Sequence, residues 1–151
     1  MGGSNVGISI GGDVSFIRAE KQFSIRYLHN FEAGYFLFLH DEFPVENVMD
    51  VGILYGWRKQ VKAVSFSIAG GISIVRGIER GDFLNSCTEC FFYQGYYEPV
   101  KYTTIGIPLD CHFIYHPNSW FIGYGLSGFG NLNLKKSFSG ILFSLQFGDL
   151  T

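Results

Sequence analysis

Apolar residues recur at every second position along most of the chain, and the longest clear example runs from Asn47 to Ile74. Successive side chains of a β-strand point to opposite faces of a sheet, so a period of two predicts strands. A polar turn at 58–60 divides the stretch into two arms. We therefore predict a β-hairpin with one apolar face, made of Met49, Val51, Ile53, Tyr55 and Trp57 on the first arm and Val64, Phe66, Ile68, Ile72 and Ile74 on the second.

The opposite face of this hairpin carries mainly small residues: Gly52, Gly56, Ala63, Ser65, Ser67, Ala69, Gly71 and Ser73. The water-facing side of a soluble antiparallel sheet would be strongly polar instead. Small uncharged side chains suit the crowded interior of a narrow barrel whose apolar face is turned outward to lipid. The pattern therefore favours a membrane-spanning barrel.

The same alternation predicts further strands, which gives about seven strands in a single domain over 1–151. In the strand over 103–115, Pro108 cannot donate a hydrogen bond to a neighbour, so we expect a bulge or a local edge there. In the strand over 120–127, Phe121 is expected to point inward together with Gly123. The remaining predicted strands cover 6–16, 22–31 and 140–147.

The predicted connections alternate between short turns, at 18–21, 58–62 and 116–119, and long loops, at 32–46 and 79–96. Membrane barrels have this asymmetry. Aromatic residues gather where the strands meet the short turns, as expected of a membrane-interface girdle. We assign to this girdle Phe16, Phe23, Trp57, Tyr115, Trp120 and Phe147.

The two long loops are rich in aromatic residues, with Tyr35–Leu39 in the first and 91–97 in the second. Such loops either pack on their own scaffold or bind a partner. A protein or glycan partner is therefore expected at 32–46 or 79–96, if anywhere.

Composition narrows the function classes. Charged residues make up 16% of the chain, against about 25% in an average soluble domain. The net charge of -2 provides no basic surface for nucleic acid. No apolar run approaches the roughly 20 residues of a membrane-spanning helix. No signal-peptide pattern is visible at the start, although an exported barrel needs one. Either the signal peptide has been removed, which would fit the loss of an upstream strand, or the export interpretation is wrong.

Strand parity directs several charged residues inward, and Arg26, Asp50 and Asp110 are expected at similar depth. Buried charges must be paired or hydrated. We expect an interior polar cluster in which Arg26 bridges the two carboxylates and holds strands in register. A pore constriction or a proton-linked site is the alternative, although side chains usually fill an eight-stranded interior. The residues directed inward are Asp13, Arg26, Asp50, Asp110 and His112.

Other candidate chemistry is sparse. Cys87 and Cys90 form a C-x-x-C motif, but it lacks the βαβ setting of a redox motif and the further ligands of a zinc site. A loop disulfide or two free thiols is the better interpretation, and Cys111 is interpreted as a small apolar residue. His29 and His40 have no serine and carboxylate at matching height. We therefore expect no metal, no cofactor and no enzymatic activity.

The chain resembles the small, typically eight-stranded outer-membrane β-barrels of Gram-negative bacteria. The resemblance is seen in three segments, Asp50–Gly56, Thr104–Pro108 and Leu142–Phe147. The last is similar to the assembly signal of that family, although four residues follow Phe147 here. The resemblance implies an antiparallel up-and-down transmembrane barrel in the outer membrane, with a structural or loop-mediated binding role. It also implies an even strand number, so the eighth strand would come from upstream or from Tyr35–Leu39.

The competing interpretation is a soluble, lipocalin-like barrel that turns its apolar face inward around a small apolar ligand. Such a barrel would carry charged residues on the outer face of its strands. Those are scarce in the predicted strands, and the membrane interpretation is therefore preferred.

Overall fold

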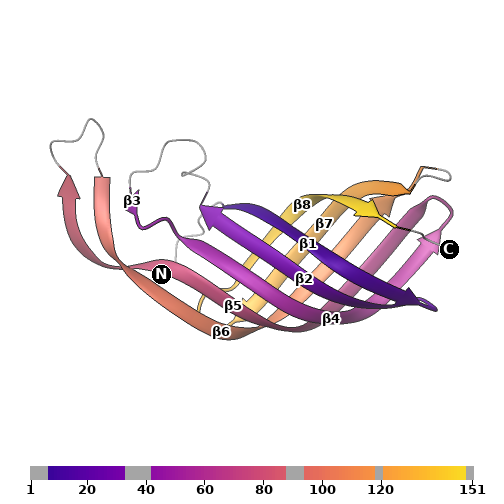
Figure 1. Cartoon of the computed structure of the whole chain (residues 1–151), viewed down its shortest axis with the longest axis horizontal. Coiled ribbons are helices and arrows are strands. Elements are labelled where there is room, and N and C mark those ends of the chain that lie inside the picture. Colours follow the sequence, from indigo (N-terminus) through magenta and orange to yellow (C-terminus); the bar gives the residue numbers. More distant parts are fainter. Residues whose placement is uncertain (1–6, 33–41, 88–93, 118–120, 149–151) are drawn as a thin grey trace.

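The computed structural model describes residues 7–32, 42–87, 94–117 and 121–148, and these residues contain strands and turns but no helix (Figure 1). No helix among them is long and apolar enough to cross a bilayer. The strands are β1 (Gly7–Arg18), β2 (Lys21–Glu32), β3 (Glu42–Phe43), β4 (Asn47–Val61), β5 (Val64–Cys87), β6 (Gln94–Tyr115), β7 (Ile122–Asn133) and β8 (Phe138–Phe147).

Seven of these strands form one up-and-down antiparallel sheet in the order β1-β2-β4-β5-β6-β7-β8. The two-residue β3 lies off this path and pairs with β6 in parallel. The predicted all-β, up-and-down architecture is therefore confirmed. Every step along the path joins neighbours in sequence, apart from the insertion of β3, so short connections suffice.

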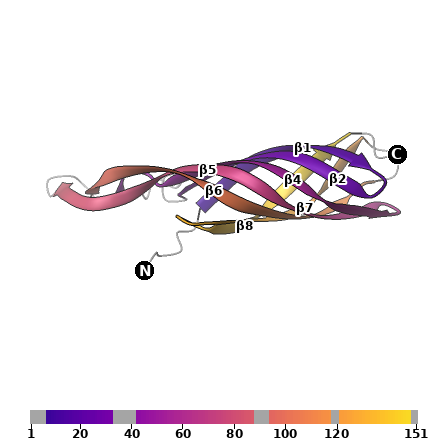
Figure 2. The ribbon, with the colours of Figure 1, turned by 90° about the horizontal axis from the view of Figure 1, so that it is seen from below.

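The sheet curls around an interior but is not closed (Figures 1 and 2). Among the described residues, β1 and β8 have no hydrogen-bonded ladder between them. Because the meander has seven strands, its first and last strands run in the same direction. The two edges that would meet in a closed barrel are therefore parallel to each other.

The two faces of the sheet differ as the alternation predicts. Inward-facing Leu28, Leu54 and Val75 are almost completely buried, and the inward serines of β5 are also buried. Outward-facing side chains are exposed apolar residues on every long strand, for example Ile105 and Ile141. The apolar face therefore points away from the interior.

The small residues of the inner face let neighbouring strands curl tightly. A Cβ atom at Gly125 would overlap the carbonyl oxygen of Phe113, and one at Gly71 would overlap that of Ile53. A side chain at either position would push backbone apart, so glycine is required there by space.

Several local predictions are wrong. The expected loop at 79–96 is largely a two-stranded arm, because β5 continues to Cys87 and β6 begins at Gln94. At Pro108 the β5–β6 ladder is interrupted between Gly70↔Leu109 and Ser73↔Gly106 with its register unchanged, so the local-edge alternative holds and the bulge does not.

Two further positions differ from prediction near the ends of β7. Phe121 points outward and is 65% exposed, because it precedes the regular alternation that begins in β7. At the other end β7 continues to Asn133, six residues beyond the predicted strand over 120–127. The expected pairing segment Tyr35–Leu39 lies outside the described residues.

Candidate functional site

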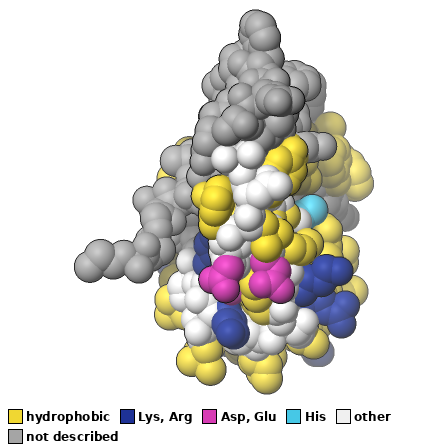
Figure 3. All heavy atoms as spheres, turned by 90° about the vertical axis from the view of Figure 1, so that its left-hand side faces the viewer, with side chains coloured by type: hydrophobic (Ala, Val, Ile, Leu, Met, Phe, Trp, Pro, Cys, Tyr) yellow, Lys and Arg dark blue, Asp and Glu magenta, His cyan; other side chains and the backbone are white. Residues whose placement is uncertain are grey.

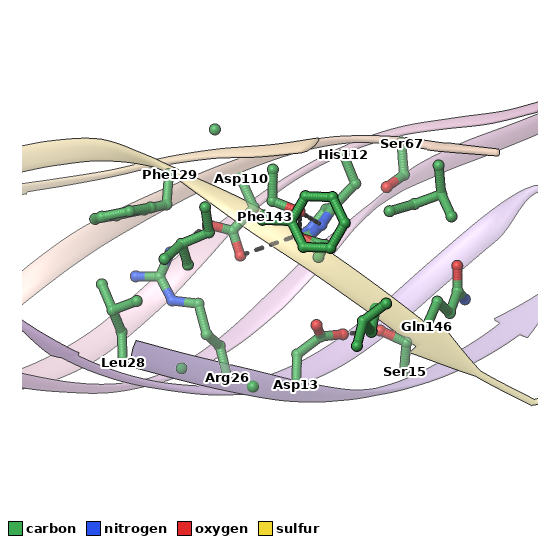
Figure 4. Close-up of a pocket in the computed structure, with 18 of the residues that line it drawn as sticks. Asp13, Ser15, Arg26, Leu28, Ser67, Asp110, His112, Phe129, Phe143 and Gln146 are labelled. Carbon is green, nitrogen blue, oxygen red and sulfur yellow. Dashed lines mark hydrogen bonds and ion pairs between the residues drawn. The ribbon is translucent and has the colours of Figure 1, made fainter. Parts of the chain in front are cut away.

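Arg26 lies at the centre of the interior polar cluster. Its Nη1 donates to Asp110 Oδ1 and its Nη2 donates to Asp50 Oδ2. All three side chains are buried, with exposed fractions of 5% for Arg26, 6% for Asp110 and 0% for Asp50. Figure 4 shows the Arg26 side chain rising from β2 toward Asp110 and His112 on the opposite wall. The guanidinium therefore links β2 both to its neighbour β4 and, across the interior, to β6.

Asn131 is a second hydrogen-bond donor to Asp50 Oδ2, and it was not anticipated from the sequence. Its Nδ2 donates to Asp50 Oδ2 at 3.0 Å and to Ser73 Oγ at 2.8 Å. The side chain is 1% exposed. The alternation that directs Ser127 inward, continued by four residues, would have identified it.

His112 extends the cluster toward β7 and β8. Its Nδ1 lies 2.6 Å from Ser127 Oγ, which in turn hydrogen-bonds with Ser144 Oγ. Its Nε2 lies 4.0 Å from Asp110 Oδ2. That gap exceeds hydrogen-bond length, and Asp110 is directed at Arg26 instead. The serine, imidazole and carboxylate therefore meet without the hydrogen bond that would orient a catalytic base.

An interior cavity of about 580 Å³ lies beside this cluster, lined by residues that include Ser67, His112 and Asp13. Its short-turn end is crossed by Arg58, which donates to Ser65 Oγ at 3.2 Å and to Gln146 Oε1 at 3.4 Å. A second hollow, of about 1000 Å³, lies toward the long-loop end between β1 and β8. Both hollows are bounded partly by the unpaired edges.

Charged side chains also gather at the long-loop end, which faces the viewer in Figure 3. Arg80 Nη2 donates to Glu32 Oε2 at 2.5 Å, and Lys136 Nζ donates to Glu46 Oε2 at 2.5 Å. The Arg80 backbone N–H donates to Glu46 Oε1 at 3.3 Å. Burial opposes ionisation of Glu46, but Lys136 and Arg80 outweigh it and lower the pKa of this carboxyl below its ordinary value. These contacts join the end of β2, the residue before β4 and Arg80 of β5 to the β7–β8 turn.

Five of the six residues assigned to the girdle lie on the outer face at the short-turn end, and Trp120 lies outside the described residues. Phe16 pairs with Phe23 across β1 and β2. Tyr115 packs edge-on against Tyr124, with ring centroids 5.6 Å apart. Trp57 Nε1 donates to Glu20 Oε2 at 3.2 Å in the neighbouring turn. Phe147 is 62% exposed.

The arm formed by the ends of β5 and β6 extends beyond the rest of the sheet at the long-loop end (Figure 1). It carries exposed Phe83 and Leu84, and Phe83 packs edge-on against Tyr97. Phe43 of β3 stacks on Tyr96, with ring centroids 5.7 Å apart. The β5–β6 ladder of the arm is irregular between Arg80 and Asn85. The arm is therefore an aromatic surface supported by few neighbouring strands.

Of the three cysteines, the structure describes the side chain of Cys111. Cys111 is a free thiol exposed on the outer face, and Cys90 lies outside the described residues. Within the described residues, no group of three or more His, Cys, Asp and Glu side chains is arranged to bind a metal ion. Comparison with family models, curated proteins and solved structures found no match.

Proposed function

We propose that this protein is an integral outer-membrane β-barrel, with a structural role or a binding role at its long-loop end. The observation that carries this proposal is the inverted distribution of side chains. The inner face holds buried charges and serines, whereas the outer face exposes large apolar side chains on every long strand. A soluble protein rarely exposes a contiguous apolar surface of this extent.

The interior supports a structural role over a pore or an enzyme. Arg26 crosses it from β2 to β6, and Arg58 crosses it from β4 to β8. Interiors of narrow barrels are filled in this way by their own side chains. The inward position of these charges also disfavours the soluble alternative, in which an apolar ligand would occupy the interior.

The arm supports the choice of the long-loop end as the binding surface. Phe83 is 53% exposed and Leu84 is 63% exposed, and they project beyond the strands that would cross the bilayer. Exposed apolar side chains on a projecting element are typical of interaction sites. A protein or glycan partner at this end fits their position.

Depth-dependent quenching of tryptophan fluorescence tests the membrane assignment. In a Trp120→Phe variant, Trp57 is the sole tryptophan, because the chain contains two. The variant is folded into lipid vesicles that carry bromine at known depths along the acyl chains. Strong quenching by shallow bromines is expected, with weaker quenching by deep ones. If no brominated lipid quenches Trp57, the membrane proposal fails and the soluble barrel is favoured.

A further inference from the structure

Three neighbouring strands place a cation next to each girdle aromatic, on the same outward face and closer to the short turns. Phe16 is followed by Arg18 on β1, Phe23 is preceded by Lys21 on β2, and Trp57 is followed by Lys59 on β4. The step is two residues in each case, which is about 6 to 7 Å along a strand. All three cations are exposed.

The register brings these cations close to one another. Arg18 is directly opposite Lys21, and Lys21 is directly opposite Trp57, two residues from Lys59. Like charges that face each other across strands are destabilising. Lys62, exposed in the following turn, adds a fourth positive charge. We call Arg18, Lys21, Lys59 and Lys62 the cationic patch.

No carboxylate among the described residues forms an ion pair with the cationic patch. The nearby acidic residue is Glu20, which accepts a hydrogen bond from Trp57. Four positive charges and one negative charge leave a local excess of three. The charges at the long-loop end are different, because Arg80 and Lys136 are paired with glutamates there.

The cationic patch also occupies only one side of the sheet. The corresponding positions next to the outward aromatics of β5 and β6 are Val64 and Pro117, and the outward end of β7 is Ile122. A generally basic rim would distribute cations around all strands. The concentration on β1, β2 and β4 indicates a local binding surface.

We propose that the cationic patch binds the phosphate groups of anionic phospholipids in the leaflet at the short-turn end. This inference rests on the proposed membrane location. An aromatic girdle lies at headgroup depth, so side chains one step further from the bilayer centre reach the phosphates. Each lysine or arginine near an anionic leaflet strengthens association about fivefold at low ionic strength, and salt weakens the effect.

Trp57 is a local reporter for this site because it is directly opposite Lys21. The Trp120→Phe protein is folded into phosphatidylcholine vesicles that contain an equal fraction of either brominated phosphatidylglycerol or brominated phosphatidylcholine. The ratio of the two quenching curves gives the preference for the anionic lipid beside Trp57. We expect a preference of at least about fivefold at low salt. A Lys21→Gln, Lys59→Gln double variant lowers the local excess of charge from three to one, and should reduce the preference by about fivefold or more.

The matched control is Lys135→Gln, which removes an exposed lysine at the long-loop end and should leave the preference unchanged. If the double variant does not fold, salt tests the same point in the Trp120→Phe protein, where raising salt from about 0.01 M to about 1 M should abolish the preference. Equal quenching by both brominated lipids, or a preference unaffected by salt or by the double variant, would overturn the inference. Absence of quenching by either lipid would instead refute the membrane location itself.

Discussion

Replacement of Arg26 by methionine is the most direct test of the interior cluster. The change keeps an unbranched side chain of similar reach but removes the cation between Asp50 and Asp110. Both carboxylates would remain buried, with exposed fractions of 0% and 6%. Their side chains would then face the interior without a counter-charge.

The magnitude follows from the burial of the two carboxylates. Breaking a buried ion pair by removing one partner costs about 3–5 kcal/mol, because the remaining charge is uncompensated. The hydrogen bond from Asn131 to Asp50 is present before and after the change, so it does not offset this cost. Since Arg26 pairs with two carboxylates, we expect the free energy of unfolding to fall by at least about 3–5 kcal/mol in Arg26→Met.

Urea unfolding in detergent micelles, followed by Trp57 emission in the Trp120→Phe background, measures this change. Adding Asp50→Asn and Asp110→Asn to Arg26→Met removes the buried charges, and should restore about half of the loss or more. The control is Arg18→Met, which removes an exposed arginine and should change stability by no more than about 0.5 kcal/mol.

Two outcomes would refute this reasoning. A loss of less than about 1 kcal/mol in Arg26→Met would mean that water already compensates both carboxylates. A full loss in the triple variant as well would mean that packing of the Arg26 side chain matters, and that its charge does not.

Two further predictions concern strand contact and pH. Gly125→Val should prevent folding, because a Cβ atom at this position overlaps the Phe113 carbonyl oxygen. Loss of the β-sheet signal in circular dichroism would measure this effect. The control Gly12→Val should fold, since a Cβ atom there has open space. The pKa of Glu46 is lowered in the folded protein. Its ion pair with Lys136 therefore contributes stability at pH values above 4.5, the ordinary pKa of this carboxyl, and the contribution is lost as pH falls through the folded pKa. Urea midpoints measured across this range should decline less in Glu46→Gln than in wild type; equal declines would show that the ion pair contributes nothing.

The sequence was sufficient to predict the sheet because its alternation is nearly unbroken. From β2 to β6, inward Gln22, Arg26, Asp50 and Asp110 all follow from parity alone. A one-residue slip would have turned each of them toward the outer face. Parity therefore places these four buried side chains on the inner face.

The arm could not be predicted because its local composition is typical of a loop. Gly, Asp, Asn and Ser interrupt the alternation between Gly81 and Ser86, and such residues are typical of turns. Strand pairing there depends on the contact between Phe83 and Tyr97, which are far apart in sequence. Asn131 was missed for a related reason, because the sequence Asn131-Leu132-Asn133 is typical of a turn. Its position on the inner face is evident only from its contacts with Asp50 and Ser73.

The open sheet restricts how this chain can exist in lipid. In hydrocarbon, the backbone groups of β1 and β8 cannot remain without partners. Direct closure would join them as a parallel pair, whereas one additional strand between them would run antiparallel to both and give the even number usual for bacterial barrels. Direct closure would therefore satisfy the backbone groups alone, whereas one additional strand would satisfy both the backbone groups and the even strand number.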